Sequence, residues 1–392
     1  MTDPLMSTYS RLPVSFERGA GATLWDRDGR AYLDAVSGIA VCGLGHAHPA
    51  VTRAVCEQAG TLVHTSNLYG IPRQAELATE LTRLSGMETA FFCNSGAEAN
   101  EAAIKLARLY GHQRNVAQPA VVVAEGSFHG RTLATLAATG NRKVQAGFEP
   151  LVQGFLRVPY DDLDGLRAIA ANSPNAVALL LEPIQGEGGV RVPSDDYLPR
   201  VRALCDEFGW LLMLDEVQTG IGRTGAWFGF QHSGIQPDVI TLAKGLGNGV
   251  PIGACLARGT AAHLFSPGSH ASTFGGNPLA CSAALAVLRT IGEQDLLTRA
   301  RELGDRIRAG LQRGLSPADG VRAIRGRGLM IGIELDRPCG DLVRRALERG
   351  LLINVTTERV IRLLPPLVLT DAEADRIVAE VAGLVQAFCA AA

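Results

Sequence analysis

An acidic residue and a lysine follow two successive apolar segments in the middle of the chain. Asp215 comes directly after residues 211–214, and Lys244 comes directly after residues 239–243. Burying either charge at the end of an apolar strand is costly unless the charge finds a partner. The two side chains could pair with each other or reach solvent. They could instead bind one cofactor, pyridoxal phosphate (PLP), with the aspartate on a protonated pyridine nitrogen and the lysine in a Schiff base with the aldehyde.

A third segment offers the anion site that this cofactor needs. Residues 91–94 lead into Ser95, Gly96 and Ala97, where a strongly helical sequence begins. Backbone N–H groups and the positive end of the dipole at a helix N-terminus favour an anion such as phosphate. A Ser-Gly helix start is usually an ordinary cap, so the prediction rests on the combination of three strand ends with partners for phosphate, ring nitrogen and aldehyde.

The chain also contains a literal G-x-G-x-x-G pattern, at residues 220–225. A dinucleotide-binding loop must open a helix whose N-terminus meets the pyrophosphate. The residues that follow are rich in glycine and aromatic side chains and run into Pro237, and they do not fit a helix. Asp215 and Glu216 would also place negative charge next to the phosphates. The pattern is therefore not interpreted as a nicotinamide site.

Short apolar segments alternate with amphipathic helical patterns through the middle of the chain. Segments bounded by Gly, Pro and Asp, with little polar alternation, are typical of strands buried on both faces. They are residues 90–93, 120–124, 176–181, 210–214, 239–243 and 252–257, with helical patterns at 97–109 and 198–208 among them. This alternation predicts an α/β fold in which helices cover both faces of a mainly parallel sheet that binds ligands at the carboxyl ends of its strands.

The pattern changes towards both termini. Asn277 and Pro278 have the residue types of a helix cap and first helical position, and residues 370–373 form a capping box before a closing helix. The other signals are a hairpin-like segment at 24–33 and strand-like segments at 330–335 and 360–364. We predict a large domain over residues 46–285 and a smaller α+β domain built from residues 1–45 and 286–392.

Composition excludes several classes of function. The chain has 37 Lys and Arg against 39 Asp and Glu, a net charge of −2, whereas binding along a nucleic-acid backbone needs a basic excess. No apolar run approaches the ~18 residues of a membrane span. Eight scattered cysteines without zinc-site spacing, and an N-terminus unlike a signal peptide, predict a cytoplasmic protein. His46 and His48 lack a spaced acidic or thiol partner, so we expect a structural turn and no metal site.

The chain resembles the class III (ornithine and 4-aminobutyrate type) PLP-dependent aminotransferases. The resemblance is specific over residues 214–225, 237–239 and 243–247, and covers nearly the whole chain through segments 24–26, 94–99, 128–132, 182–189, 272–278 and 326–332. Within the family the chain is most similar to the acetylornithine branch, through residues 8–9, 37–41, 64–69 and 127–131. The resemblance implies PLP-dependent transferase fold type I.

The resemblance also implies roles for individual residues. Lys244 would bind the cofactor aldehyde and then, as a freed amine, move a proton between substrate and cofactor. Asp215 would keep the pyridine nitrogen protonated. The other implied cofactor contacts are Ser95, Gly96 and Ala97 at the phosphate, Phe128 and Val217 on the two faces of the ring, Gln218 at the ring hydroxyl, Glu216 beside them, and Thr273 reaching the phosphate in the neighbouring subunit.

The substrate-binding residues implied by the resemblance are mostly charged. Arg131 would hold the substrate carboxylate, and Arg362 would hold the α-carboxylate of 2-oxoglutarate, since guanidinium binds carboxylate bidentately. Arg362 lies inside an apolar segment, so a structural ion pair is the alternative. Glu187 would neutralise Arg362 while the first amino donor is bound. Ser272 would lie beside the substrate.

The activity implied is ping-pong transfer of the terminal amino group of N2-acetyl-L-ornithine to 2-oxoglutarate. The products are N-acetyl-L-glutamate 5-semialdehyde and L-glutamate, as in arginine biosynthesis, and the enzyme would be a homodimer with shared sites. Succinylornithine, ornithine, 4-aminobutyrate and N-succinyl-diaminopimelate are alternative donors within the family. A PLP aminomutase of the same fold, which needs no 2-oxoglutarate, also stays open. A cofactor-free scaffold is argued against by Lys244 and Asp215 together.

Overall fold

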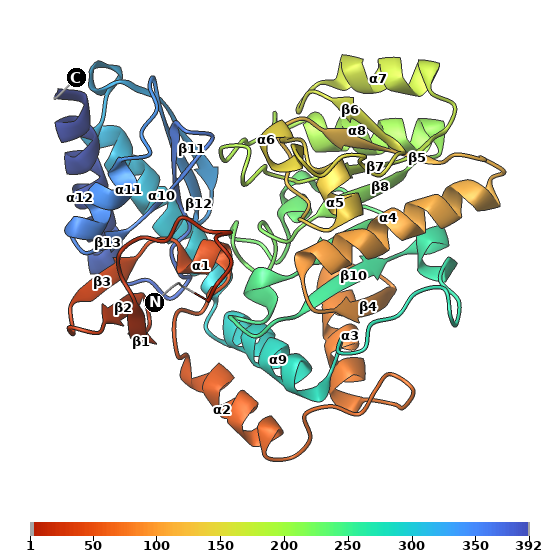
Figure 1. Cartoon of the computed structure of the whole chain (residues 1–392), viewed down its shortest axis with the longest axis horizontal. Coiled ribbons are helices and arrows are strands. Elements are labelled where there is room, and N and C mark those ends of the chain that lie inside the picture. The colour runs from red at the N-terminus through yellow and green to blue at the C-terminus, as the bar shows by residue number, and fades with distance from the viewer. Residues whose placement is uncertain (1–3, 391–392) are drawn as a thin grey trace.

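The computed structural model describes residues 4–390, which form two lobes joined at the bottom of Figure 1. A seven-stranded sheet forms the centre of the larger lobe. Its order is β4 (Thr89–Cys93), β10 (Gly253–Ala257), β9 (Val239–Leu242), β8 (Leu211–Asp215), β7 (Ala176–Leu181), β5 (Ala120–Ala124) and β6 (Phe155–Val158). The strands from β9 to β6 run parallel, and β10 is antiparallel to both of its neighbours. The mainly parallel sheet is confirmed.

Helices cover both faces of this sheet, as predicted. On β5, the side chains of Val121 and Val123 belong to one core cluster and Val122 belongs to another, because successive side chains of a strand point to opposite faces. Ala103 of α4 (Gly96–Gln113) packs in the first cluster and Val201 of α8 (Tyr197–Phe208) in the second. The α/β architecture therefore follows from strands that are apolar on both faces.

The remaining helices of the larger lobe surround this sheet. They are α2 (Pro49–Ala59), α3 (Pro72–Ser85), α5 (Leu133–Ala138), α6 (Arg142–Gln145), α7 (Leu163–Asn172) and α9 (Pro278–Glu293). Asn277 caps α9 by accepting a hydrogen bond from the N–H of Ala280, and Pro278 is the first helical residue. This confirms the predicted start of α9. The residues after the G-x-G-x-x-G pattern form turns and a short 3₁₀ helix, Gly229–Ser233, so no helix opens from the pattern.

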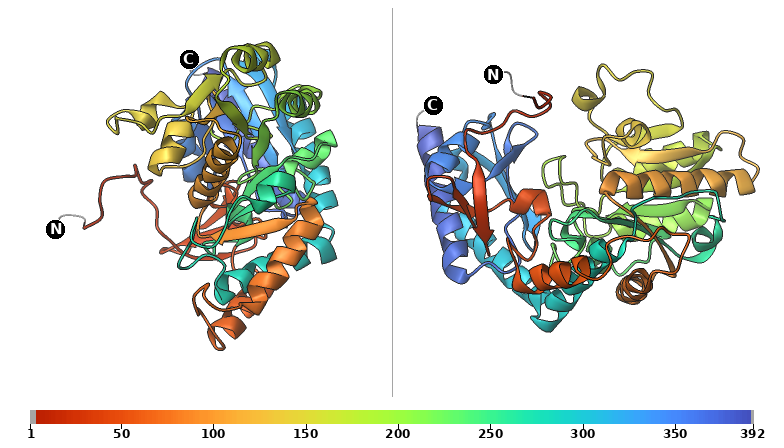
Figure 2. Two further views of the ribbon diagram at one scale, coloured as in Figure 1. Left: turned by 90° about the vertical axis from the view of Figure 1, so that its right-hand side faces the viewer. Right: turned by 60° about the horizontal axis from the view of Figure 1, so that its bottom comes forward.

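The smaller lobe contains two four-stranded sheets. One has the order β1 (Phe16–Ala20), β2 (Thr23–Asp26), β3 (Ala31–Asp34) and β13 (Leu351–Leu352); the other has β11 (Val321–Arg327), β12 (Met330–Leu335), β15 (Val360–Leu363) and β14 (Asn354–Thr356). Because β13 pairs with β3, segments from both ends of the chain share one sheet (Figure 2). The predicted hairpin is β2–β3. The proposed domain boundaries stay a prediction.

Helices α10 (Leu296–Gly314), α11 (Leu342–Glu348) and α12 (Asp371–Ala390) complete the smaller lobe, and α1 (Ser37–Ala40) lies near the junction of the lobes in Figure 1. The predicted capping box precedes α12, where Thr370 and Glu373 exchange side-chain to backbone hydrogen bonds. None of the helices between residues 4 and 390 has the length and apolar character needed to cross a membrane.

Candidate active site

A cavity of about 250 Å³ opens at the carboxyl ends of the parallel strands. Residues that follow β4, β5, β7, β8 and β9 line it. They are Gly96, Ala97, Asn100, Phe128, His129, Gly130, Arg131, Glu182, Glu187, Asp215, Val217, Gln218 and Lys244. The structure therefore brings together nine of the residues singled out from the sequence, at the edge of the sheet where an α/β fold binds its ligands.

Asp215 ends β8 and is almost completely buried. Three donors hold its carboxylate: Oδ2 accepts from Asn100 Nδ2 at 2.8 Å and lies 2.8 Å from His129 Nδ1, and Oδ1 accepts from the backbone N–H of Val217 at 3.0 Å. These hydrogen bonds offset the cost of burying the charge. The alternative in which Asp215 is paired with Lys244 is not what the structure shows.

Lys244 lies two residues beyond the end of β9, in the wall of the cavity. Its backbone has a φ of 46°, a left-handed conformation that is uncommon for a residue with a side chain and that clusters at functional sites. Burial lowers the pKa of its ammonium group below the ordinary value, with Glu187 opposing the shift. A lowered pKa increases the fraction of neutral amine, which is the form that attacks an aldehyde.

The N-terminus of α4 faces the cavity through Gly96 and Ala97. Ser95 caps the helix, because its hydroxyl accepts from the N–H of Glu98 at 3.2 Å. The helix offers no acceptor to the N–H groups of Gly96 and Ala97, which belong to its first turn. A Cβ on Gly96 would lie 2.8 Å from Cγ1 of Val217, so only glycine allows this close approach. The turn keeps the features predicted for a phosphate site.

Phe128 and Val217 provide the apolar surfaces of the cavity. Phe128 is held from behind by Glu182, whose buried carboxylate accepts from the backbone N–H groups of Phe128 at 3.1 Å and Gly186 at 3.0 Å. Burial raises the pKa of Glu182 to about 7, although nearby His129 and these N–H groups lower it. Glu182 therefore supports the cavity wall. Gln218 contributes a buried amide on the Val217 side.

Arg362 is buried in β15 of the smaller lobe and bonds across to the larger lobe. Its Nη1 lies 2.6 Å from Oε1 of Glu187 and donates to Oε1 of Gln218 at 3.3 Å. Its Nε and Nη2 both donate to Oδ1 of Asn354, at 3.1 and 2.7 Å. Glu187 and Arg362 are thus close together, as predicted. The same ion pair is also what a purely structural role of Arg362 would require.

Arg131 lies at the rim of the cavity and is exposed. Its guanidinium carbon is 5.7 Å from the centre of the Phe128 ring. Together with Phe128 and Glu187 it also lines a more open cavity of about 580 Å³, which continues outwards between α6 and β14. A cation at this rim can bind the distant carboxylate of a long substrate.

Five residues singled out from the sequence are not among those that line the cavity: Ser95, Glu216, Ser272, Thr273 and Arg362. Ser95 caps α4, and Arg362 bonds to Glu187 and Gln218 on the cavity wall. Glu216 points away from the cavity, because its buried carboxylate accepts from the N–H groups of Gly229 and Phe230, both at 2.8 Å. The side chain is therefore bonded to the loop at Gly229 and Phe230, and the cofactor contact implied for Glu216 stays a prediction. Ser272 accepts from Asn94 Nδ2 at 3.3 Å, behind the phosphate turn, and Thr273 is exposed. The roles implied for Ser272 and Thr273 stay predictions.

Sequence reasoning missed several polar residues of the site. His129, Asn100 and Asn354 hold Asp215 or Arg362, yet each is a neutral or weakly basic residue with no local signal in the sequence. The two histidines considered as metal ligands have structural partners: His46 lies 2.8 Å from Asp34, and His48 accepts from the N–H of Ala50. Between residues 4 and 390, no three His, Cys, Asp or Glu residues form a metal-binding group.

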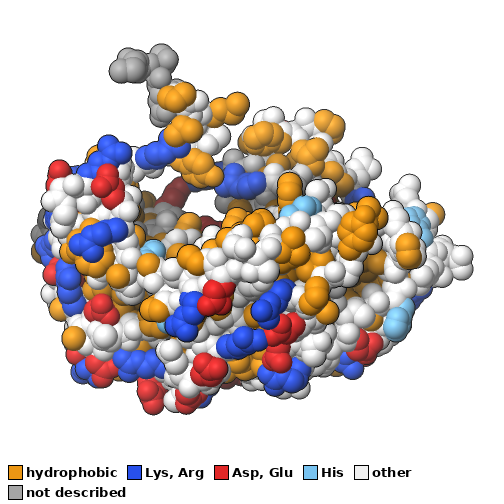
Figure 3. All heavy atoms as spheres, turned by 90° about the horizontal axis from the view of Figure 1, so that it is seen from below, with side chains coloured by type: hydrophobic (Ala, Val, Ile, Leu, Met, Phe, Trp, Pro, Cys, Tyr) orange, Lys and Arg blue, Asp and Glu red, His pale blue; other side chains and the backbone are white. Residues whose placement is uncertain are grey.

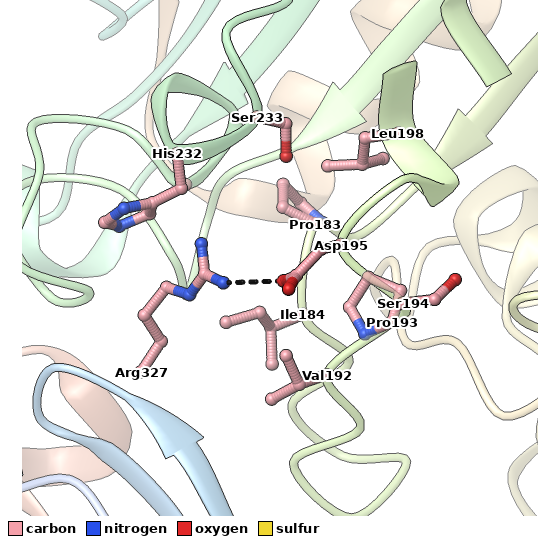
Figure 4. Close-up of a pocket in the computed structure, with 11 residues that line it drawn as sticks. Pro183, Ile184, Val192, Pro193, Ser194, Asp195, Leu198, His232, Ser233 and Arg327 are labelled. Carbon is pink, nitrogen blue, oxygen red and sulfur yellow. Dashed lines mark hydrogen bonds and ion pairs between the residues drawn. The ribbon is translucent and has the colours of Figure 1, made fainter. Parts of the chain in front are cut away.

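Pro183 and Ile184, in the segment that follows β7, help to line a separate cavity of about 120 Å³ (Figure 4). Arg327 reaches into it from the smaller lobe and pairs with Asp195 at 3.4 Å. His232 and Ser233 border it, and His232 is committed to Thr224 at 3.1 Å. This cavity shares no lining residue with the one that contains Lys244 and Asp215.

The residues of the main cavity fit PLP. A buried carboxylate suits a protonated ring nitrogen, a lysine with a lowered pKa suits the aldehyde, and the N–H groups of Gly96 and Ala97 suit the phosphate. Phe128 and Val217 suit the two faces of a flat ring. The glycine at position 96 leaves room that any Cβ would fill. The site thus offers partners for the ring nitrogen, the aldehyde, the phosphate and both faces of the ring.

Comparison with known proteins gives matches along nearly the whole chain. The aminotransferase class-III family model matches residues 6–385. Acetylornithine aminotransferase of Nitrosomonas europaea is 60% identical over 98% of both chains, and acetylornithine aminotransferase 1 of Bordetella pertussis is 56% identical over 100% of this chain and 99% of that one.

Solved structures match as fully. The ornithine aminotransferase of Toxoplasma gondii has a TM-score of 0.95 at 35% identity, covering 98% of this chain and 93% of that one. The N-acetylornithine aminotransferase of Stenotrophomonas maltophilia has a TM-score of 0.85 at 37% identity, covering 98% of this chain and 99% of that one.

The chain has three lysines, Lys105, Lys143 and Lys244, so the point of cofactor attachment can be tested against a small set. We expect borohydride to fix PLP on Lys244, because it lines the cavity and its pKa is lowered by burial. Lys244→Ala should lose the visible absorbance and the reducible bond, whereas Lys143→Ala, which changes an exposed lysine, should keep both. Mass spectrometry of the reduced protein identifies the modified residue. An unchanged adduct in Lys244→Ala would overturn the assignment.

Proposed function

The chain belongs to the class III aminotransferases, whose fold is PLP-dependent transferase fold type I, and from this premise we propose that it moves the terminal amino group of N2-acetyl-L-ornithine to 2-oxoglutarate. The products are N-acetyl-L-glutamate 5-semialdehyde and L-glutamate, and the place of the reaction is arginine biosynthesis. One observation carries the proposal: a single cavity combines Lys244 and Asp215 with the exposed Arg131, and the buried Arg362 bonds to two of its lining residues, Glu187 and Gln218. The names of the relatives support acetylornithine as donor.

Bound PLP supplies an aldehyde that accepts the amino group and a ring that withdraws electrons from the carbon that loses its proton. Asp215 would hold the ring nitrogen, and the first turn of α4 would hold the phosphate. Phe128 and Val217 would hold the faces of the ring, and Gln218 would supply an amide for its hydroxyl. The position of these residues on the cavity wall supports the proposed roles.

Lys244 carries the proton transfers in this proposal. With PLP bound, Lys244 would hold the aldehyde until a substrate amine replaced it, and its freed amine would then stay beside the reacting carbon because the backbone of Lys244 is fixed just after β9. A free amine held in the cavity can act as the general base, and because it is already in position no base has to come from bulk solvent. Burial lowers the pKa of Lys244 below its ordinary value, which increases the fraction of neutral amine that can accept a proton.

The two arginines let one cavity bind two kinds of donor. Acetylornithine has its reacting amine far from its carboxylate, so its carboxylate fits Arg131 at the rim. Glutamate has its reacting amine beside a carboxylate, which fits Arg362 once Glu187 moves away. Asn354 holds two donors of Arg362 independently of Glu187, so the guanidinium keeps its orientation after the acid leaves. Glu187 has a partly exposed side chain, while Thr356 anchors its backbone carbonyl.

A homodimer completes the proposed site. Leu68, Tyr69 and Phe274 are 86%, 70% and 61% exposed, and the two segments touch because Asn67 donates to the carbonyls of Ser272 and Gly275. Large exposed apolar groups on one contiguous surface are typical of an interface. Further hydrophobic side chains are exposed on the side of the molecule shown in Figure 3. Thr273 lies within this surface, next to Phe274, from where it would reach the partner's phosphate site.

The proposed location is the cytoplasm. All eight cysteines are free thiols in the structure, and five of them are buried, which suits a reducing compartment.

The choice of donor is tested with a panel of amines. With 2-oxoglutarate as acceptor, we expect kcat/KM for glutamate formation to be highest with N2-acetylornithine. The comparison donors are succinylornithine, ornithine, 4-aminobutyrate and N-succinyl-diaminopimelate. Ornithine is the informative control, because its free α-amino group brings a positive charge next to the carboxylate that Arg131 binds. A higher kcat/KM with any other donor would replace acetylornithine in the proposal.

Glu187→Gln tests the masking of Arg362. Removing the negative charge leaves Arg362 free to attract α-carboxylates, an effect of roughly 1.5–3 kcal/mol if it equals one charge-assisted hydrogen bond. We expect the half-reaction with glutamate to gain relative to the half-reaction with acetylornithine, measured as separate single-turnover rates.

Glu334→Gln is the matched control for this variant. Glu334 pairs at 2.5 Å with Arg325, which binds the carbonyls of Gly189 and Val190 in the same loop, but it does not touch Arg362. It should leave the ratio of the two rates unchanged. An equal fall of both rates in Glu187→Gln would make Glu187 a structural support and contradict the masking role.

The shared site is tested by mixing two inactive variants. In the proposed dimer each site takes Lys244 from one subunit and Thr273 from the other. A mixed dimer of Lys244→Ala and Thr273→Asp therefore has both changes in one site and no change in the other. After random subunit exchange we expect at most about a quarter of the wild-type activity. Mixing Lys244→Ala with Asp215→Asn should restore nothing, because both residues belong to the same subunit's cavity. No recovery in the first mixture, with subunit exchange demonstrated, would refute the role of Thr273.

A further inference from the structure

Asp215 is held by a buried chain of side chains that begins at Thr241. Thr241 Oγ1 donates to Oδ1 of Asn100 at 2.7 Å, and Asn100 Nδ2 donates to Oδ2 of Asp215 and to the carbonyl of His129, both at 2.8 Å. All four residues are almost completely buried. Both polar atoms of the Asn100 amide therefore have partners. The oxygen accepts from the Thr241 hydroxyl, and the nitrogen donates to the Asp215 carboxylate and the His129 carbonyl.

These hydrogen bonds join three elements of the larger lobe, the strands β8 and β9 and the helix α4. Thr241 lies on β9 directly opposite Asp215 on β8, and Asn100 comes from the second turn of α4. The helix whose first turn faces the proposed phosphate site thus also fixes the carboxylate at the proposed ring nitrogen. Because Thr241 lines no part of the cavity, it can act on the cofactor only through Asn100 and Asp215.

The hydrogen bonds distinguish the two oxygens of Asp215. Oδ2 has both Asn100 and His129 as partners, whereas Oδ1 accepts from the backbone N–H of Val217. His129 uses Nδ1 on this carboxylate, and its buried Nε2 has no partner in the described chain. A carboxylate oxygen accepts more than one hydrogen bond, so Oδ1 keeps a lone pair for a further donor.

We propose that Thr241 is a positioning residue for the cofactor: its hydroxyl holds the Asn100 amide, which with His129 occupies Oδ2 of Asp215 and leaves Oδ1 to receive the N–H of the pyridine ring. This inference rests on the proposed function, because the orientation of Asp215 matters only if a pyridinium lies against it. The hydroxyl of Thr241, and not the volume of its side chain, then determines the affinity for the cofactor.

Two variants of Thr241 separate the hydroxyl from the volume. Thr241→Val keeps the branched shape suited to a buried strand and removes the hydroxyl, leaving the Asn100 carbonyl oxygen without its donor. Thr241→Ser keeps the hydroxyl and removes a methyl group. If the hydroxyl acts as proposed, Val is the damaging change and Ser is tolerated. A residue that only packs gives the opposite order, because Val fills the space and Ser leaves a gap.

The measurements are equilibrium binding of PLP to the apoenzyme, followed by fluorescence, and kcat and KM of the loaded enzyme. We expect Thr241→Val to lose about tenfold in PLP affinity and in kcat, the effect of one buried hydrogen bond, with KM for both substrates within about twofold of wild type. Thr241→Ser should stay within about twofold in all of them. Adding Thr241→Val to Asn100→Ala should cause no further loss, because the effect passes through Asn100.

Equal PLP binding and kcat in Thr241→Val and wild type would overturn the inference, as would a larger loss in Ser than in Val or additive losses with Asn100→Ala. Failure of the wild-type protein to bind PLP or to form glutamate would instead overturn the proposed function. Thermal unfolding of each apoenzyme shows whether a loss reflects misfolding. If Thr241→Val does not fold, the Ser variant still decides between hydroxyl and volume.

Discussion

The buried carboxylate of Asp215 is the constraint on which the rest of the site depends. A charge at the end of an apolar strand in the middle of a sheet is stable only if the fold brings donors to it. Those donors come from α4, from the loop after β5 and from the backbone after β8. Meeting this demand places the N-terminus of α4 and the ring of Phe128 around the same cavity. The groups proposed to bind a phosphate and a flat ring are therefore arranged by the interactions that keep the acid buried.

The second constraint joins the two lobes. Arg362 enters the site from β15, so its charge has to be met by groups of the larger lobe, and Glu187 and Gln218 provide them. Buried ion pairs contribute little net stability, because desolvation offsets much of the attraction. A pair of this kind, with Asn354 able to hold the arginine alone, is better explained by a change of partner during the reaction. The half-exposed side chain of Glu187 and its anchored backbone fit that change.

The site residues that could be found from the sequence are charged residues whose burial among apolar residues costs free energy. Asp215 and Lys244 end apolar segments, and Arg362 lies inside one. The central strands could be predicted because they are apolar on both faces. Strands β6 and β11 were not predicted. β6 contains Arg157, and β11 alternates apolar side chains with arginines, so neither forms an apolar run. Asn100 and Thr241 carry no local signal, because their partners lie 115 and 141 residues away. The side chain of Glu216 is directed away from the cavity because neighbouring residues at a strand end point to opposite sides, and the roles of Glu216, Ser272 and Thr273 stay predictions.

The central claim is that one cavity with one lysine runs two successive half-reactions with different carboxylate substrates. It is tested most directly by mixing PLP-loaded enzyme with N2-acetylornithine carrying ¹⁵N on its terminal amine, and following products before and after addition of 2-oxoglutarate. The account predicts a single equivalent of semialdehyde per subunit without 2-oxoglutarate, and then continuous formation of ¹⁵N-glutamate once it is added. Continuous turnover of acetylornithine without 2-oxoglutarate, with the label kept in the same carbon skeleton, would contradict it and indicate an aminomutase.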